Sequence, residues 1–546
     1  MKKRLYLLGK RSFGLSSRCA LFCIVLGAIV AAVVSNVPHP ATAQTSLSAR
    51  ESRGKQIYLR GTSPSGKEIL AYVGESAMEA PASNFPCANC HGLDGQGKPE
   101  GGITPSNISW EALTKVYGVK HLNGRQHPAY TSRGLELAIT RGIDPAGNKL
   151  QTVMPRYVIS REDLADLVVY LERLGKYEEP GISETRIIIG TVVPAKGSLA
   201  DMGQVTTTVI KAFFDEINSR GGIYNRQLEL KVVETAETPE GTRANVARLI
   251  KDEQVFAMTG AFIAGYEKEV VPLMAEKEVP LIGPMTLYPQ TIFPLNRYVF
   301  YLLSGVEEQA CALIDFIDQN SKFNNKSIVF AYPRNEMNAR VVEAIRERSK
   351  KNGLSSPHTF AYEAGQFDAT AMTRQFQKAG YDIVFLLTGS EEVLSFLKEA
   401  AALEWFPFVF LPGTAGALDL FRAPPNFNSK VFVSFPTSPS DHSEAELKEF
   451  RALAAKYNFP SQHRVAQVSA YTSVKILVEA LKRAGRHLSR EELIKALEGL
   501  YEYPTGLTPA ITYGPNRRIG AMGAWVVTLD LEKKQFLPAS KWIGIN

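Results

Sequence analysis

The chain has 546 residues, too many for one hydrophobic core and enough for about three or four domain-sized units. Hydrophobic residues make up 45% and charged residues 21%, as in ordinary soluble globular proteins. The formal net charge is +7, but six basic residues and no acidic residue fall in the first 43 positions. The remainder has 56 basic against 55 acidic residues. No basic field is left to steer nucleic acid, so we expect no nucleic-acid partner.

Residues 1–43 have the three parts of an export signal. A basic stretch precedes the uninterrupted apolar run 19–34, and the small-residue pattern Ala41-Thr42-Ala43 follows. We expect a signal peptide that is cleaved after Ala43, and therefore a periplasmic protein. An uncleaved membrane anchor is the alternative. The apolar run of 16 residues favours cleavage, because about 17–25 residues are needed to span a bilayer.

Two helices are predicted in the segment that follows. Residues 44–82 are polar and rich in glycine and serine, with one short helix over 49–60. Residues 161–174 carry leucine and valine at three- and four-residue steps, which predicts an amphipathic helix. Ser160 is its expected N-cap and Gly175 its expected stop.

From residue 185 the pattern changes to alternating strands and helices, after a linker predicted over 177–184. Strands are predicted over 186–193, 228–234, 255–259, 280–282, 327–332, 382–387, 408–411 and 431–435, and helices over 203–219 and 242–251. Apolar strands alternating with amphipathic helices indicate parallel sheets covered on both faces. Residues 185–546 exceed a single open sheet, so two α/β lobes are expected.

The segment Cys87-Ala88-Asn89-Cys90-His91 is the most specific motif of the chain. Two thiols at this spacing can add to the two vinyl groups of one haem, and the histidine then meets the iron. A redox Cys-x-x-Cys pair and half of a zinc site are the alternatives. The redox pair does not need His91, and a zinc site needs further ligands. Cys311 is expected to be a buried small hydrophobe, so we predict one covalent haem c.

Met154 is the best candidate for the sixth iron ligand. It lies in a polar loop beside Pro155, where core packing explains a methionine poorly. His121 and His127 are rivals for the position. A filled sixth position disfavours dioxygen binding and peroxidase chemistry, and a thioether ligand raises the reduction potential relative to two histidines.

Residues 47–175 resemble a class I cytochrome c domain. The resemblance is carried by the Cys-Ala-Asn-Cys-His-Gly segment, the glycine-rich segment 94–97, the pair Met154-Pro155 and the final helix. It implies a small all-α domain, here over 44–176, with His91 and Met154 as axial ligands of a low-spin haem. Such a domain works as a one-electron carrier.

A second resemblance covers residues 185–546. The segments 189–194, 214–218, 221–223 and 513–515 are similar to those of type I periplasmic binding proteins, in particular the branched-chain amino-acid group of ABC-transporter receptors. The resemblance implies a two-lobed α/β fold with parallel sheets, three crossings between the lobes, and a solute in the cleft.

The loops at the carboxyl ends of the parallel strands are expected to contact the solute. The candidate residues are Ala195, Lys196, Phe262, Ala264, Gly265, Met285, Thr286 and Tyr332. The resemblance also implies a serine that binds the solute carboxylate, with a threonine nearby. Ala264 or its neighbour replaces the serine, Thr286 matches the threonine, and no acid for an α-ammonium is evident around 412–414. A less polar or differently charged solute is therefore as well supported as an amino acid.

No motif for hydrolytic or transferase catalysis is found, so no catalytic residue and no enzyme is predicted. The first hypothesis is a periplasmic electron carrier between redox proteins such as a dehydrogenase, an oxidase or another cytochrome. Its second domain recognises a small organic solute or docks the redox partner. The alternative is an ABC-type solute receptor with a permease partner, in which haem senses or stabilises. A haem redox enzyme is the third reading, which Met154 disfavours.

Overall fold

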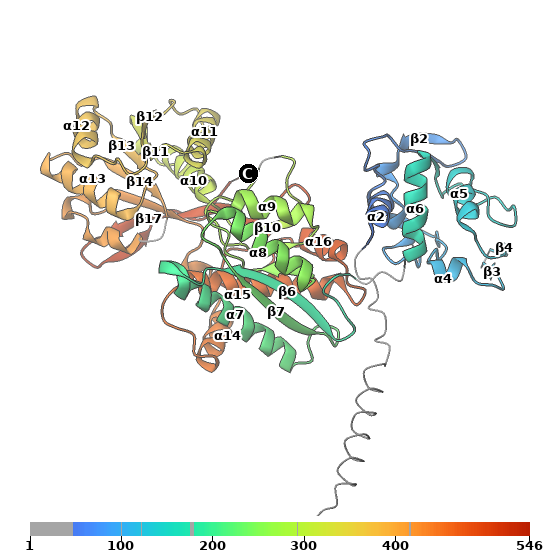
Figure 1. Cartoon of the computed structure of the whole chain (residues 1–546). Coiled ribbons are helices and arrows are strands. Elements are labelled where there is room, and N and C mark those ends of the chain that lie inside the picture. The colour runs from blue at the N-terminus through green and yellow to red at the C-terminus, as the bar shows by residue number, and fades with distance from the viewer. Residues whose placement is uncertain are drawn as a thin grey trace, which may run out of the picture. The chain divides into compact units, whose positions relative to one another are not determined.

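The structure is a computed structural model that describes residues 47–99, 101–121, 123–174, 179–291, 293–413 and 417–545. The predicted signal peptide, the Gly175 helix stop and Thr414 lie outside these residues. The chain divides into two compact units, Met1–Tyr177 and Glu178–Asn546, and each is described by itself (Figure 1). No helix of the described ranges is long and apolar enough to cross a membrane.

The N-terminal unit is built around two packed helices, α2 and α6. Its helices are α2 (Ala49–Arg60), α3 (Cys87–His91), α4 (Trp110–Leu113), α5 (Ser132–Arg141) and α6 (Arg161–Arg173). Gly54 permits a close approach, because a Cβ there would lie 2.1 Å from the carbonyl oxygen of Asp166 on α6. Ser160 caps α6 by accepting a hydrogen bond from the Asp163 amide at 3.1 Å, so the predicted helices 49–60 and 161–174 and this N-cap are confirmed.

This unit also contains short strands that the sequence analysis did not predict. An antiparallel sheet has the order β2-β1-β5, and β3 pairs with β4. Their bounds are β1 (Leu70–Val73), β2 (Met78–Pro81), β3 (Val119–Lys120), β4 (Gln126–His127) and β5 (Arg156–Val158). Strands of two to four residues are too short to show a period-two pattern, so sequence reasoning passes over them.

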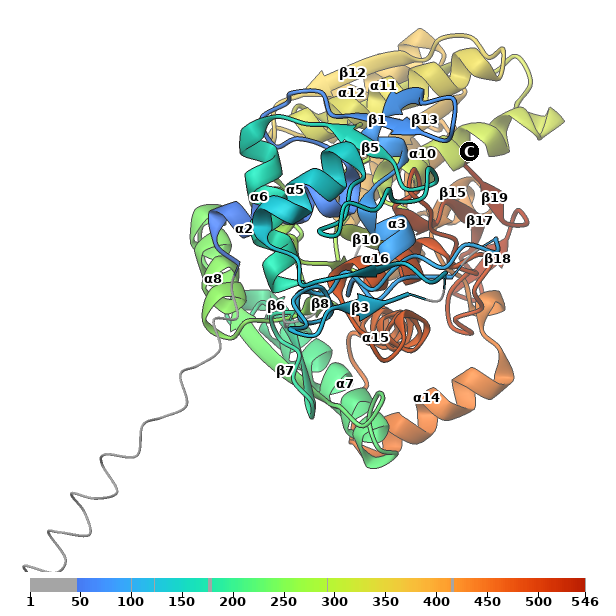
Figure 2. The same cartoon turned by 90° about the vertical axis from the view of Figure 1, so that its right-hand side faces the viewer.

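The first lobe of the C-terminal unit, lobe 1, is a parallel sheet with the order β16-β10-β9-β8-β6-β7. The strands are β6 (Arg186–Val193), β7 (Gln227–Glu234), β8 (Ala257–Thr259), β9 (Leu281–Ile282), β10 (Val299–Leu303) and β16 (Ile519–Ala521). The helices are α7 (Ala200–Ser219), α8 (Pro239–Asp252), α9 (Glu267–Glu276), α14 (Glu444–Lys456), α15 (Arg464–Ala484) and α16 (Arg490–Glu498). Figure 2 shows α8 and α7 on opposite faces of the sheet, so both faces are buried as predicted.

The second lobe, lobe 2, is a mixed sheet with the order β12-β11-β13-β14-β15-β17-β18. The strands are β11 (Ile328–Pro333), β12 (His358–Tyr362), β13 (Ile383–Leu386), β14 (Phe408–Pro412), β15 (Val431–Phe435), β17 (Gly523–Asp530), β18 (Gln535–Pro538) and β19 (Ile543–Gly544). The helices are α10 (Val306–Asp318), α11 (Glu336–Lys351), α12 (Ala369–Ala379) and α13 (Ser390–Ala402).

In the core of lobe 2, aromatic and aliphatic residues alternate along the strands and face opposite sides of the sheet. Phenylalanines on four neighbouring strands face α10 and α11, with ring centroids 4.3, 5.2 and 4.9 Å apart along the row Phe330, Phe385, Phe410 and Phe432. The intervening aliphatic residues face α12 and α13. This is the period-two pattern of a strand with both faces buried.

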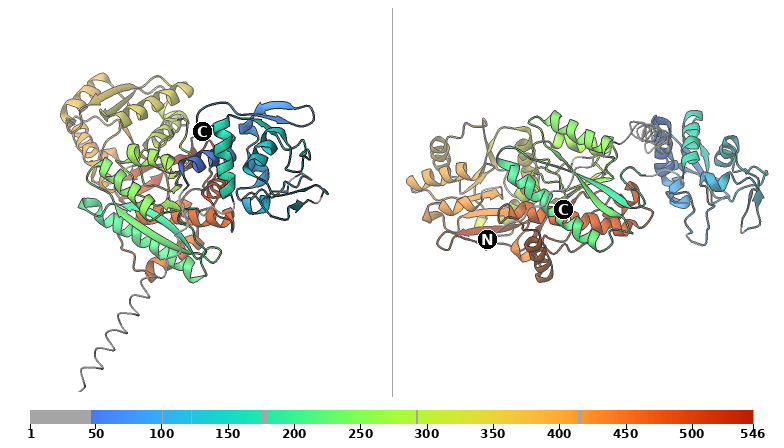
Figure 3. Two further views of the ribbon diagram at one scale, coloured as in Figure 1. Left: turned by 45° about the vertical axis from the view of Figure 1, so that its right-hand side comes forward. Right: turned by 60° about the horizontal axis from the view of Figure 1, so that its bottom comes forward.

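The chain passes between the lobes three times, as the fold class predicts (Figure 3). The crossings lie between β10 and α10, between β15 and α14, and between β16 and β17. Ser304 joins the first and third, because its Oγ donates to the Ala521 carbonyl at 3.0 Å and accepts from the Gly523 amide at 2.7 Å. Trp525 joins the second and third by donating its Nε1–H to Asp441 at 3.1 Å.

The segment 179–184, expected as part of a linker, packs against the first strand of lobe 1. Ile182 bridges Ile187, and the Ile188 amide donates to the Gly181 carbonyl at 2.7 Å. A Cβ on Gly181 would lie 2.3 Å from the Phe256 amide nitrogen, which leaves room for glycine only.

Candidate functional site

The Cys-x-x-Cys-His motif forms its own short helix, α3, directly after Pro86. Cys87 is half-buried, Cys90 is exposed, and both thiols are free. Burial raises the pKa of the Cys87 thiol to about 11, so this thiol is protonated at neutral pH. The glycine-rich segment folds back onto α3, because the Gly97 and Lys98 amides donate to the His91 and Cys90 carbonyls at 2.8 Å.

Two buried tyrosines fix the ends of α3. The Tyr58 hydroxyl donates to the Gly92 carbonyl at 2.7 Å, and the Tyr157 hydroxyl donates to the Phe85 carbonyl at 2.6 Å. Tyr58 belongs to α2 and Tyr157 to β5, so elements that are distant in sequence position the motif.

The His91 ring is oriented by the backbone. Its Nδ1 lies 3.0 Å from the carbonyl oxygen of Ser106, which can only accept, so Nδ1 carries the proton. With Nδ1 protonated, the lone pair of Nε2 could bind a metal ion. Burial lowers the pKa of His91, which favours the neutral ring that a metal ligand requires.

Met154 ends a turn that immediately precedes β5. The Arg156 guanidinium holds this turn by donating to the carbonyls of Met154 and Leu150, the latter at 2.8 Å. The Gly74 amide, next to β1, donates to the Thr152 carbonyl at 3.0 Å. Met154 thus stands three residues before Tyr157, which contacts the start of the motif helix.

His121 and His127, the rival ligands, face each other across 2.9 Å between their Nε2 atoms. Arg125 contacts the His121 Nε2 at 2.9 Å and forms a buried ion pair with Asp144 at 2.7 Å. The His127 Nδ1 lies 2.8 Å from the Pro128 carbonyl. The ring nitrogens of this pair are used within the protein, which favours Met154 over either histidine as an iron ligand.

In lobe 1, the loops that follow β8 and β9 lie side by side at the carboxyl edge of the sheet. Phe262 and Met285 form a parallel bridge, and the Met285 amide donates to the Ala261 carbonyl at 2.8 Å. The Phe262 amide donates to the Val192 carbonyl at 2.8 Å, which joins these loops to the end of β6. The structure therefore brings together Phe262, Ala264, Gly265, Met285 and Thr286, with Ala195 and Lys196 exposed on the loop after β6.

A carboxylate that the sequence analysis missed lies among these loops. Glu267, at the start of α9, is 8% exposed. Its Oε2 accepts from the Gly265 amide at 2.9 Å, and its Oε1 accepts from the Thr286 hydroxyl. Its sequence position, two residues after a candidate glycine, was the available signal. The family resemblance instead implied an acid around residues 412–414.

Lobe 2 faces these loops through the start of α11. Lys268 and Glu336 form an ion pair between the lobes at 2.5 Å, and the Tyr288 hydroxyl lies 3.5 Å from Asn338 Oδ1. Tyr288 and the predicted Tyr332 both pack against the core of lobe 2. These contacts join the lobes where the carboxyl ends of parallel strands from both lobes meet, which is where open α/β sheets generally bind their ligands.

Family comparison matches both units. The model of the family described as periplasmic binding protein matches residues 186–535, well over half of the chain. The chain belongs to the periplasmic binding protein family. The cytochrome c model matches residues 82–175, so the chain also carries a cytochrome c domain in front of its binding-protein domain.

The curated relatives correspond to the binding-protein domain. A Leu/Ile/Val-binding protein BraC3 of Rhizobium johnstonii is 22% identical over 336 residues, which are 61% of this chain and 89% of that protein. A leucine-, isoleucine-, valine-, threonine- and alanine-binding protein of Pseudomonas aeruginosa is 20% identical over 322 residues, 59% of this chain and 84% of that protein.

Solved structures share the fold of the binding-protein domain. A branched-chain amino-acid ABC transporter protein of Thermus thermophilus with bound valine has a TM-score of 0.55 at 18% identity, over 67% of this chain and 98% of that one. A fatty-acid ABC transporter substrate-binding protein of Thermomonospora curvata has a TM-score of 0.54 at 16% identity, over 67% and 95%. At such identities the likeness establishes the fold alone.

The donor set of the cytochrome c domain fits the covalent haem c that this family implies. Two thiols and a histidine share α3, and the His91 Nδ1 is already occupied by the Ser106 carbonyl. Cys87 and Cys90 would hold the porphyrin and His91 the iron, and the bound group would supply one-electron redox chemistry. Among the described residues no group of three or more His, Cys, Asp or Glu side chains could hold a metal ion.

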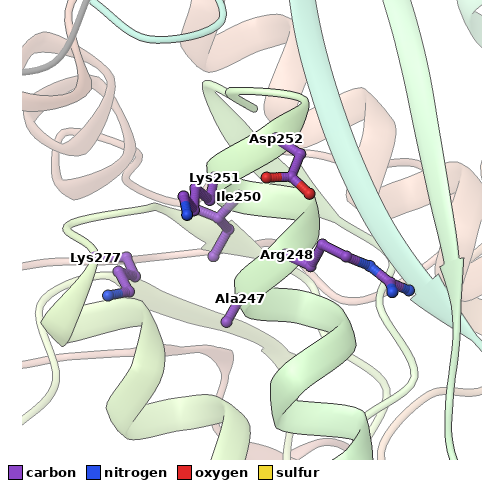
Figure 4. A pocket seen from close by; sticks show the side chains of 6 residues that line it. All are labelled: Ala247, Arg248, Ile250, Lys251, Asp252 and Lys277. Carbon is purple, nitrogen blue, oxygen red and sulfur yellow. The ribbon is translucent and has the colours of Figure 1, made fainter.

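A separate depression of about 500 Å³ lies on lobe 1 beside α8, and it is not part of the cleft (Figure 4). Arg248, Lys251 and Lys277 line it together with Asp252. Lys251, Lys277 and Arg248 are all exposed, and Lys277 is paired with Glu276 at 2.8 Å. These charges form a solvated surface near the edge where the strands of lobe 1 begin, opposite the cleft loops.

Proposed function

We propose that the protein is a periplasmic c-type cytochrome that carries one haem for one-electron transfer and binds a small organic solute in the cleft of its second domain. The observation that carries the proposal is the oriented His91 beside two free thiols on one helix, in the same chain as a two-lobed binding-protein fold. The redox partner would be a dehydrogenase, an oxidase or another cytochrome. The families of both domains are typically periplasmic, which supports this location.

A solute receptor is the second candidate, since the matched binding-protein family and the relatives are amino-acid-binding and ABC-transporter proteins. In that case the partner is a membrane permease, and the haem senses or stabilises. A single experiment tests whether solute binding and haem redox state are coupled. The mature, haem-loaded protein is titrated redoxometrically with and without a panel of small solutes, and the unfolding temperature of the binding domain reports which solutes bind.

The expected result follows from the thermodynamic linkage between solute binding and haem reduction. A solute whose affinities for the oxidised and reduced protein differ tenfold shifts the midpoint potential by about 59 mV. A shift means that solute binding and haem redox state are coupled, as in a solute-gated electron carrier or a receptor whose haem senses the solute. A solute that stabilises the binding domain and leaves the potential unchanged means that the two domains work independently. Failure of every solute to stabilise the domain would refute the binding role.

The proposed axial role of Met154 has its own test. Met154→Ala should lower the midpoint potential and allow an added ligand such as imidazole to bind the haem, because a coordination position is opened. The control is Met78→Ala, at a methionine that is 56% exposed on β2. Unchanged potential and spectrum in Met154→Ala would remove Met154 from the ligand set.

A further inference from the structure

Beside the loops that follow β8 and β9, lobe 1 holds an internal carboxylate where the family resemblance places a carboxylate of the solute. Thr286 is the matched threonine, and its hydroxyl donates to Glu267 Oε1. The same hydroxyl oxygen accepts from the Tyr288 amide at 2.9 Å. A hydroxyl has one proton to donate, so Thr286 has none left for a carboxylate of the solute.

A second hydrogen-bond donor near the site, a backbone amide, is also occupied by Glu267. The Gly265 amide, in the loop that follows β8, donates to Glu267 Oε2 at 2.9 Å. The neighbouring position, where the family has a serine hydroxyl, is Ala264, which has no donor in its side chain. An incoming carboxylate would therefore meet a like charge and no free side-chain hydroxyl from Ala264 or Thr286.

Within the described part of the chain, no cationic side chain forms an ion pair with the Glu267 carboxylate. Both of its recorded partners are neutral donors. The nearby Lys268 is paired with Glu336 across the cleft. A carboxylate offers about four acceptor positions, of which two are used here, and a charge that is 8% exposed is stable when a cation or further donors complete its shell.

The surroundings are suited to a cationic group. Burial raises the pKa of the Tyr288 phenol, and the charge of Glu267 raises it further, so Tyr288 stays neutral beside the carboxylate. An aromatic face beside a carboxylate is a common setting for an organic cation. A carboxylate that only held the Gly265 turn would also make the two observed hydrogen bonds, but it would be indifferent to amines.

We propose that Glu267 is the counter-ion for the ammonium group of an organic amine, and that the cleft rejects solutes with an α-carboxylate. The inference rests on the proposed solute-binding role and names its substrate class. Glu267 binds the ammonium, while Gly265 and Thr286 hold the carboxylate in place.

Matched small molecules test the polar head group of the solute separately from its hydrocarbon part. Isopentylamine, isopentanol and leucine share a branched hydrocarbon and differ in carrying an amine, an alcohol, or an amine with an α-carboxylate. A series of shorter and longer alkylamines, each with its alcohol and amino acid, covers other chain lengths. The mature haem-loaded protein is titrated calorimetrically, and the unfolding temperature of the binding domain is followed in parallel.

At least one amine should bind ~100-fold more tightly than the amino acid with the same hydrocarbon part. The α-carboxylate of the amino acid would face the Glu267 carboxylate, and like charges in a desolvated site are strongly unfavourable. Glu267→Gln should weaken amine binding by a similar factor and reduce the discrimination against the amino acid. Glu269→Gln, in the same first turn of α9, changes the charge equally and should leave the affinity unchanged. If Glu267→Gln does not fold, Glu267→Asp is the second variant. Its side chain keeps the negative charge but is one methylene shorter, so amine binding should still be weaker.

The outcomes are distinct from those for the proposed function. If leucine binds as tightly as isopentylamine, or if Glu267→Gln leaves the ratio unchanged, the amine assignment is overturned and solute binding stands. Absence of binding by every amine also overturns it. Only the failure of the wider solute panel refutes the binding role itself.

Discussion

Glu308 makes the stability of the binding-protein domain dependent on pH. It lies in the first turn of α10, directly after the first crossing between the lobes, and is 6% exposed. Its Oε2 accepts from the Gly305 amide at 2.8 Å. Burial raises its pKa from 4.5 to about 7, the neighbouring Glu307 adds to the effect, and Arg340 and the Gly305 amide oppose it.

The sign follows from proton binding. Between pH 4.5 and 7 the folded state retains a proton at Glu308 that the unfolded state has lost, so stability is present at low pH and falls as pH rises through 7. A difference of about 2.5 pKa units corresponds to about 3 kcal/mol in total, and to about 2–3 kcal/mol between about pH 5 and about pH 8.

The change to make is Glu308→Gln, which keeps an acceptor for the Gly305 amide and cannot ionise. The unfolding free energy of the binding domain in the mature protein is measured from about pH 5 to about pH 8 for the wild type and the variant. The wild type should lose about 2–3 kcal/mol more than the variant across this range. Glu347→Gln, at an exposed glutamate on α11, is the control and should follow the wild type. Parallel pH profiles of wild type and Glu308→Gln would refute the reasoning.

Two further changes test packing near the sites. Tyr157→Phe removes the donor to the Phe85 carbonyl and should cost the cytochrome c domain about 1–2 kcal/mol in denaturant unfolding followed at the haem. Tyr72→Phe on β1 removes only an exposed hydrogen bond to Glu79 and should cost little. Equal losses in the two variants would contradict this role of Tyr157. Gly203→Ala places a Cβ 1.8 Å from the Pro194 carbonyl oxygen and should destabilise the binding domain by about 1–3 kcal/mol, while Gln204→Ala, at an exposed neighbour on α7, should not. An unchanged unfolding temperature in Gly203→Ala would show that the loop after β6 moves freely.

Regular elements of the binding domain could be predicted from the sequence because their signals are local. Each predicted strand lies within two residues of an observed one, and Val431–Phe435 coincides with β15. Such strands are buried on both faces and are therefore runs of apolar residues. No bounds were predicted for the strands β17 and β18 near the end of the chain. Their antiparallel pairing could not be predicted, since pairing direction leaves no mark in a single segment.

The residues of the haem site could also be predicted only where their signal is local. Cys87, Cys90 and His91 lie within five consecutive residues, so the sequence alone determines that two thiols and an imidazole share one turn of helix. That the His91 Nδ1 meets the Ser106 carbonyl could not be predicted, because loop closure over 15 residues decides it.

The character of the cleft depends on tertiary structure. Glu267 and Thr286 are 19 residues apart, on loops after different strands, and only the parallel order β9-β8 brings their side chains into contact. Ser304 and Ala521, 217 residues apart, meet for the same reason at the crossings. Sequence by itself determined the haem-attachment motif and the two families, because contiguous residues carry both. The folded sheets alone decided which carboxylate occupies the cleft, because hydrogen-bonding groups there come from separate strand ends.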